Sequence, residues 1–170
     1  MLKIAQCSDL FYPVTDGVSR VVNAYARELS ARGHEVYVIT PLVTQGYRGR
    51  LNYEILDYIA LNLGAAQMKG TAAALDMHYL ARVNAHSFDI VHAHSPGSAG
   101  MEAVRIADKC RVPLVGTFHT KYIREYLLSA KDERQNQLSQ YFALDFFSRC
   151  DEIWVDRKST RLNSSHITIS

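Results

Sequence analysis

Short apolar runs alternate along the chain with longer segments in which apolar residues recur every three or four positions. Residues 3–7 form such a run, and apolar residues from Val18 to Leu29 then follow at helical spacing. Arg32 and Gly33 supply the chemistry that commonly ends a helix. This first stretch therefore predicts a buried strand followed by a helix with one buried face.

The same alternation continues toward the C-terminus. Residues 35–40 are rich in β-branched side chains and predict a strand that closes at Pro41, and residues 53–57 predict an edge-like strand. The remaining expected elements are helices over 71–86 and 97–110, a long helical region over 121–150, and strands over 88–94, 112–118 and 151–155.

Alternating helices and near-continuous apolar strands predict the α/β class, with a doubly wound, Rossmann-like parallel sheet covered on both faces by helices. Right-handed crossovers bring the strand-to-helix loops to one edge of such a sheet, which is where ligands bind. With 170 residues and 48% hydrophobic composition, the chain has the size of a single domain.

The net charge of +2 comes from residues 156–170, because residues 1–155 carry 16 basic and 16 acidic side chains. A neutral body gives no electrostatic reason to expect nucleic acid as a partner. No run approaches the roughly 20 apolar residues that cross a bilayer, and the N-terminus does not resemble a signal peptide, so we expect a cytoplasmic protein. Cys7, Cys110 and Cys150 have no disulfide-framework or zinc-site spacing and are expected to be buried free thiols.

Residues 156–170 are polar and lack both periodicities. The stretch DRKSTRLNSSH, residues 156–166, resembles the translation of a common sequencing-library adapter, and the final IS matches the continuation of that adapter. We therefore expect 156–170 to be an artefactual tail and the natural gene to be cut off near Val155. Ser164, Ser165 and His166 are expected to have no catalytic role.

The loop after the first predicted strand contains Tyr12, Pro13, Asp16 and Gly17 and leads directly into the first helix. The first N–H groups of a helix lack internal partners and carry partial positive charge, and a glycine lets a phosphate approach the backbone. This glycine stands alone, so the loop is neither a GxGxxG nor a Walker motif. Gly17 is either a phosphate-binding residue or a turn glycine beside an Asp16 cap; Arg20 either faces the same ligand or is solvated.

Two further loops carry histidines where predicted strands end. His92 and His94 alternate along one strand and therefore share a face, and we expect them to form hydrogen bonds at the sheet edge rather than to bind a metal, because no third ligand has suitable spacing. His119 follows the next strand and is flanked by Thr120 and Lys121. It either holds a sugar hydroxyl or shifts protons near neutral pH, or it packs in the turn as structure.

As an ordered set, these motifs resemble the N-terminal domain of glycosyltransferase family 4, whose members have the two-domain GT-B architecture. The resemblance rests on FYPVTDGV, ARGHEV, DIVHAH and TFHTKY and covers residues 2–155. It implies an enzyme that transfers a hexosyl group from a nucleotide sugar to an acceptor, with retention of anomeric configuration and without a catalytic metal or another cofactor.

Carried over position by position, the resemblance implies that Gly17 approaches the donor diphosphate and that His119 contacts the donor sugar near the reacting centre. The stretch FHTKYIREYL most resembles members that glycosylate membrane lipids such as diacylglycerol or phosphatidylinositol. A membrane lipid is therefore the expected acceptor, with peripheral association at the inner face of the membrane. The expected acceptor- or sugar-binding residues are Tyr12, Pro13, Arg20, His92, His94, Thr120 and Lys121.

Residues 1–155 are thus expected to be the acceptor-side half of a GT-B enzyme whose donor-binding domain is absent from the chain. That domain would supply half of the groups that meet transition-state charge, so we expect the chain alone to be inactive. One alternative is a non-enzymatic fragment that binds an acceptor or a lipid. Another is the nucleotide-binding domain of a different Rossmann-type enzyme, although the glycine triplet and the acid after the second strand are missing.

Overall fold

The computed structural model describes residues 1–12, 16–42, 50–62, 69–71, 73–119 and 133–155. Its elements in chain order are β1 (Lys3–Cys7), α1 (Gly17–Ala31), β2 (Glu35–Leu42), β3 (Glu54–Asn62), β4 (Lys69–Thr71), the 3-10 helix η1 (Ala73–Leu75), α2 (Met77–Asn84), β5 (Ile90–Ala93), α3 (Ser98–Cys110), β6 (Leu114–Phe118), α5 (Glu133–Ser148) and β7 (Glu152–Val155).

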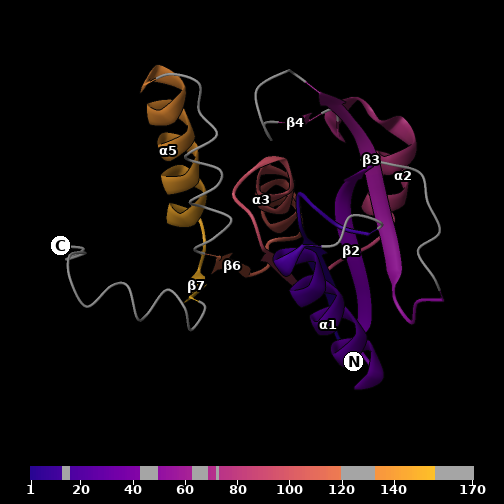
Figure 1. Cartoon of the computed structure of the whole chain (residues 1–170). Coiled ribbons are helices and arrows are strands. Elements are labelled where there is room, and N and C mark those ends of the chain that lie inside the picture. The colour runs from indigo at the N-terminus through magenta and orange to yellow at the C-terminus, as the bar shows by residue number, and fades with distance from the viewer. Residues whose placement is uncertain (13–15, 43–49, 63–68, 72, 120–132, 156–170) are drawn as a thin grey trace.

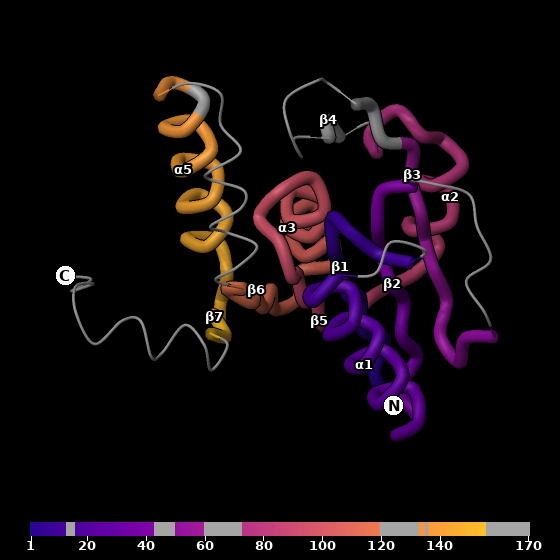
Figure 2. The backbone as a smooth tube through the Cα atoms, viewed as in Figure 1, coloured from indigo at the N-terminus to yellow at the C-terminus, as the bar shows by residue number. Residues whose placement is uncertain are grey.

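The strands form one sheet in the order β4-β3-β2-β1-β5-β6-β7. Every neighbouring pair is parallel except β3 and β4, which are antiparallel. Strands β1 and β5 lie in the middle of the molecule, whereas β3 and β4 lie toward one end and α5 and β7 toward the other (Figures 1 and 2). The predicted doubly wound, Rossmann-like α/β fold is confirmed, and the sheet changes its winding direction between β1 and β5.

Helices cover the two faces of this sheet unequally. Helices α2, α3 and α5 pack on one face, where Tyr79, Ala103 and Phe146 belong to the larger cluster of buried apolar side chains. On the other face, α1 contributes Val18 and Val22 to a smaller cluster with residues of β1 and β2. Among the described residues, the buried helix side chains of this smaller cluster all come from α1, and Phe147 of α5 packs against it half-buried.

Helix α1 begins and ends as its sequence predicts. The Asp16 carboxylate accepts a hydrogen bond from the backbone N–H of Ser19 at 2.7 Å, and the Ser19 hydroxyl accepts one from the backbone N–H of Asp16 at 2.8 Å. This reciprocal capping box fixes the first turn. The helix ends at Ala31, and Gly33 follows with a φ of 87°, a left-handed conformation that favours glycine.

The expected end of the second strand at Pro41 is wrong, because β2 continues to Leu42. The backbone N–H of Ser8 donates to the carbonyl of Ile39 at 3.0 Å, so Ile39 directs its backbone groups toward β1. Pro41 lies two residues later and faces the same side, where β1 has already ended at Cys7. Its missing N–H therefore costs no hydrogen bond of the sheet.

Two other boundaries differ from expectation. The helix expected over 71–86 begins only at Met77, because the Asp76 carboxylate caps it by accepting from the backbone N–H of Tyr79 at 2.9 Å. The strand expected over 53–57 is longer, because β3 continues to Asn62, and β4 pairs only with its last three residues, 60–62. Of the helical region expected over 121–150, residues 120–132 lie outside the described residues, and α5 covers Glu133–Ser148.

The three cysteines are free thiols, as expected, but only Cys7 is fully buried; Cys110 and Cys150 are half-buried. In the described segments, no helix has the length and apolar character to cross a bilayer. The polar tail expected over 156–170 lies outside the described residues.

Candidate functional site

A row of polar side chains lies on the α1 face of the sheet, toward the carboxyl ends of the central strands. Gln6 of β1 is in register with His92 of β5, and His92 is in turn in register with Val115 of β6. His94 and His119 directly follow β5 and β6. Because side chains alternate along a strand, every second position brings a polar group to this face.

Hydrogen bonds connect these side chains across three strands. His92 Nε2 lies 2.7 Å from Thr117 Oγ1, and His94 Nε2 lies 2.7 Å from Gln6 Oε1. His94 Nδ1 lies 3.3 Å from His119 Nε2. The rings of His92 and His94 have their centroids 4.1 Å apart, and those of His94 and His119 are stacked at 5.6 Å. The structure therefore brings together all three histidines that the sequence singled out.

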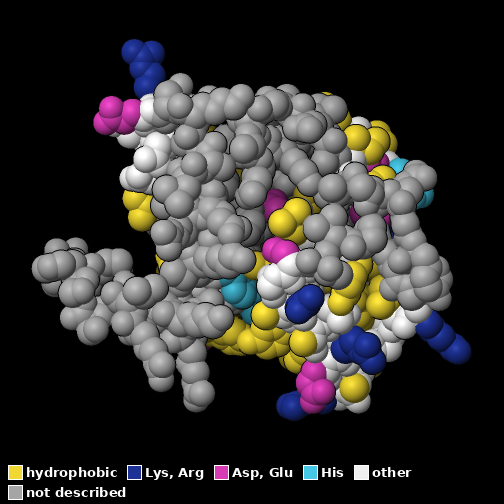
Figure 3. Space-filling view, viewed as in Figure 1, with side chains coloured by type: hydrophobic (Ala, Val, Ile, Leu, Met, Phe, Trp, Pro, Cys, Tyr) yellow, Lys and Arg dark blue, Asp and Glu magenta, His cyan; other side chains and the backbone are white. Residues whose placement is uncertain are grey.

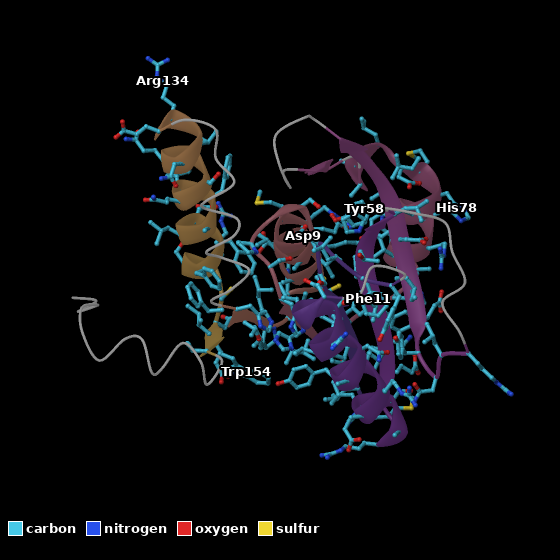
Figure 4. All side chains as sticks on the ribbon, viewed as in Figure 1. Asp9, Phe11, Tyr58, His78, Arg134 and Trp154 are labelled. Carbon is cyan, nitrogen blue, oxygen red and sulfur yellow. The ribbon has the colours of Figure 1, made fainter. Side chains whose placement is uncertain are left out.

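Two aromatic side chains border the histidine row. Tyr25 of α1 lies 5.6 Å from the His92 ring and 5.8 Å from the His94 ring, and Trp154 of β7 lies 4.9 Å from the His92 ring. Trp154 projects from β7 toward α1 (Figure 4). Histidine atoms are visible near the middle of the face shown in Figure 3, next to hydrophobic side chains. The row thus has aromatic rings from α1 and β7 beside His92.

Two of these histidines, His92 and His94, are neutral at physiological pH. His92, His94 and His119 have exposed fractions of 4%, 0% and 8%. Burial, with a smaller contribution from His119, lowers the pKa of His92 to about 4. Burial also holds the pKa of His94 well below its usual value, with the neighbouring histidines acting in the same direction. Neutral imidazoles can both donate to and accept from uncharged hydroxyl groups.

The N-terminus of α1 carries Gly17, which is exposed at the start of the helix. A Cβ added at this position would meet no described atom within 4 Å, and its φ is not in the left-handed region. Among the described residues, neither crowding nor backbone conformation therefore requires glycine here. Arg20 is exposed one turn later on the same helix, and its side chain adds positive charge close to the helix N-terminus.

The other expected ligand-binding residues are placed less informatively. Tyr12 is half-buried, its ring lies 5.2 Å from that of Phe11, and its hydroxyl accepts a hydrogen bond from Asn23 Nδ2 at 3.4 Å. These contacts attach Tyr12 to the core beneath α1. Pro13, Thr120 and Lys121 lie outside the described residues.

One buried acid was not singled out from the sequence. Asp9 follows β1, and its Oδ1 accepts hydrogen bonds from the Ser98 hydroxyl at 3.0 Å and the Ala99 N–H at 2.8 Å. Its own backbone N–H donates to Ser95 Oγ at 3.0 Å. Asp9 therefore holds the loop that joins His94 to α3 and lies beside that helix (Figure 4). An acid two residues after an apolar strand was the available signal in the sequence.

Metal binding finds no support in the described segments, which contain no group of three or more His, Cys, Asp or Glu side chains arranged to hold an ion. Two surface cavities lie at the opposite, amino-terminal edge of the sheet, one lined by Arg111 and Leu114 and the other by Glu35 and Glu54. They are therefore separate from the histidine row.

Comparison with known proteins identifies the family. The signature of Glycosyltransferase Family 4 matches residues 15–161, ending within the segment 156–170. The chain is 30% identical over 122 residues to the alpha-monoglucosyldiacylglycerol synthase of Acholeplasma laidlawii, covering 71% of this chain and 30% of that protein. It is 22% identical over 125 residues to the enzyme of the same name from Streptococcus pneumoniae, covering 71% and 27%. The chain thus spans about a third of the length of these curated relatives. It belongs to glycosyltransferase family 4.

Proposed function

We propose that this chain is the acceptor-side domain of an enzyme that transfers a hexosyl group from a nucleotide sugar to a membrane lipid, with retention of configuration. The observation that carries the proposal is the row of buried, hydrogen-bonded histidines at the carboxyl ends of β5 and β6, on the same face as α1. In open α/β sheets this edge is the usual place for a ligand. The names of the two relatives support a diacylglycerol-based acceptor.

Gly17 and His119 would bind different parts of the donor. A diphosphate is an anion and suits the positive end of the α1 helix dipole, where a Cβ built on Gly17 would meet no described atom within 4 Å. A hexose is uncharged and rich in hydroxyl groups, which suits the hydrogen-bonding side chains of the histidine row. Arg20 would add positive charge next to the diphosphate. These roles require a ligand that is charged at one end and polar but neutral at the other.

Transfer itself would need the second domain of the GT-B architecture. The described residues supply one wall of the site, and catalysis depends on preorganised groups that surround the developing charge. We therefore expect no sugar transfer by the 170-residue chain alone. The natural gene read beyond the Val155 codon should encode the second domain.

The test uses that longer protein, a nucleotide-glucose donor and vesicles that contain diacylglycerol. We expect release of nucleotide by the longer protein and none by the 170-residue chain. His119→Ala in the longer protein should lower kcat/KM by about a hundredfold or more, whereas His78→Ala, at an exposed site on α2, should leave it unchanged. An equal rate for His119→Ala and the unaltered protein would reject the assigned role of His119.

Peripheral membrane association is a second part of the proposal. Helix α5 exposes Leu138, Tyr141 and Leu144 at three-residue spacing, with exposed fractions of 50%, 64% and 71%. Such a stripe supports contact with lipid. In a flotation assay with phosphatidylglycerol vesicles, the double variant Leu138→Ser/Leu144→Ser should lose binding. The matched variant Leu75→Ser/Met77→Ser removes apolar groups that are even more exposed, outside α5, and should retain it. Equal flotation of both variants would exclude α5 as the contact.

A further inference from the structure

We infer that Gln6 and His94 are positioning residues that fix the tautomer of His119 through two consecutive hydrogen bonds. The three side chains are contributed by β1 and by the residues that directly follow β5 and β6. Their exposed fractions are 1%, 0% and 8%, so water does not compete strongly for these hydrogen bonds. The inference rests on the proposed function only where it assigns a ligand to His119.

The chain of hydrogen bonds starts at an atom that can only accept. The side-chain oxygen of Gln6 has no proton, so His94 Nε2, at 2.7 Å, must be the donor. A neutral imidazole carries one proton, and His94 Nδ1 is therefore an acceptor. His119 Nε2, at 3.3 Å from that atom, must then be the donor of the second hydrogen bond. When His119 carries a single ring proton, that proton is thus assigned to Nε2, and Nδ1 carries the lone pair.

Both steps require that His94 stay neutral. A protonated His94 would donate from both nitrogens, and His119 Nε2 would then have to accept. Complete burial and two histidine neighbours oppose a charge on His94 and lower its pKa. The packing of the row therefore supports the same tautomer as the hydrogen bonds.

The assigned tautomer restricts the ligand chemistry of His119. Any group that His119 holds through Nδ1 must donate a hydrogen bond, as a sugar hydroxyl does and a fully ionised phosphate oxygen does not. The tautomer thus favours a hydroxyl group over the diphosphate as the ligand of His119. Gln6 need not touch the sugar. It would favour a hydroxyl ligand at His119 through the two hydrogen bonds that connect Gln6 to His119.

His92 provides an internal control because it belongs to a separate branch. Its Nε2 pairs with the Thr117 hydroxyl, which can donate or accept and so imposes no tautomer. Removing that hydroxyl leaves the Gln6–His94–His119 chain intact.

The experiment measures long-range 1H–15N correlations of the histidine rings in the ¹⁵N-histidine-labelled 170-residue chain at pH 7. We expect His94 and His119 each to be protonated at Nε2. Gln6→Met removes the initial acceptor at similar volume and should shift the tautomer ratio of His119 toward Nδ1–H by about fivefold or more, the size expected from losing one hydrogen bond. His94→Phe keeps an aromatic ring but removes the acceptor nitrogen, and it should shift the tautomer ratio of His119 in the same direction. Thr117→Val should change neither His94 nor His119.

A proton on Nδ1 of His119 in the unaltered chain would overturn the inference without any variant. An unchanged tautomer of His119 in His94→Phe would also overturn it, because that variant removes the two hydrogen bonds that connect Gln6 to His119. These spectra need no substrate, so they separate this inference from the proposed function. If His119 is protonated at Nε2 but the longer protein transfers no sugar, the proposed function is rejected and the inferred hydrogen-bond chain from Gln6 to His119 stands.

Discussion

The carboxylate of Asp9, two residues after the end of β1, accepts a hydrogen bond from the backbone N–H of Ala99 in the first turn of α3, 90 positions further along the chain. Helix α3 begins after Gly97, which has no side chain to cap it. A distant acid thus does what an N-cap residue normally does locally. This contact joins the first strand to the loop that carries His94.

Asp9→Ala should destabilise the protein. The substitution leaves the Ser98 hydroxyl and the Ala99 N–H without their buried acceptor, and we expect a loss of about 1–3 kcal/mol in the free energy of unfolding. Urea denaturation would measure it. The control is Asp145→Ala, which removes an ion pair with Arg149 on the surface of α5 and should cost less than about 1 kcal/mol. Equal effects of the two substitutions would mean that Asp9 does not cap α3.

Replacing the glycines at the starts of α1 and α3 by alanine should change the stability of the protein in opposite directions. A Cβ at Gly97 would lie 2.3 Å from Asp9 Oδ2, so Gly97→Ala must displace the cap and should cost about 1–3 kcal/mol. A Cβ at Gly17 would meet nothing within 4 Å, and Gly17→Ala should stabilise the helix by up to about 1 kcal/mol. Thermal unfolding of the 170-residue chain would measure both. Strong destabilisation by Gly17→Ala would show that this glycine is needed for the fold.

Stability should fall as the solution becomes acidic. The pKa of His92 is about 4 in the folded protein and about 6.5 when the chain unfolds, so below pH 6.5 the unfolded state binds a proton that the folded state does not. His92 alone should lower the free energy of unfolding by about 2 kcal/mol between pH 7 and pH 5. His94 acts in the same direction.

Urea denaturation at pH 7, 6 and 5 would test this dependence. The variant His92→Gln should show a flatter profile, whereas His78→Gln, at an exposed site on α2, should reproduce the original slope. A profile for His92→Gln as steep as that of the unaltered chain would assign the acid sensitivity to other groups.

Tyr79→Phe should weaken the core on the opposite face of the sheet. The Tyr79 hydroxyl is buried and donates to Glu102 Oε1 at 2.5 Å, while Arg105 pairs with the same carboxylate at 2.6 Å. Losing one donor to a buried carboxylate should cost about 1–3 kcal/mol. Tyr141→Phe, at an exposed site on α5, should have no effect on the unfolding free energy. An unchanged unfolding free energy for Tyr79→Phe would show that the hydrogen bonds from Arg105 are sufficient for the Glu102 carboxylate.

The type of most elements could be predicted because strand and helix impose different periods on the sequence. Boundaries were less predictable, since they depend on contacts that periodicity does not encode. Strand β2 can include Pro41 because β1 has already ended beside it. Helix α2 begins only after Asp76, because the Asp76 side chain caps it there. The antiparallel pairing of β4 with β3 likewise had no periodic signal in three residues.

The site was predictable to a similar degree. Alternation along one strand placed His92 and His94 on one face, and the topology brought His119 to the same edge. Their partners are ordinary strand and helix residues when read in sequence. Gln6 is 88 positions from His94, and Tyr25 comes from a different element, so only the fold reveals that they meet.

Because β1 lies in the middle of the sheet, one of its edges stays unpaired during much of the synthesis of the chain. It pairs with β2 on one side. Its other side pairs with β5, residues 90–93, which emerge from the ribosome more than 80 residues later. Until then its second edge exposes unpaired backbone groups, the kind of edge to which another chain can add. The bond between Gln6 and His94 joins these same two segments, so the nascent protein cannot acquire the histidine row before its central sheet closes.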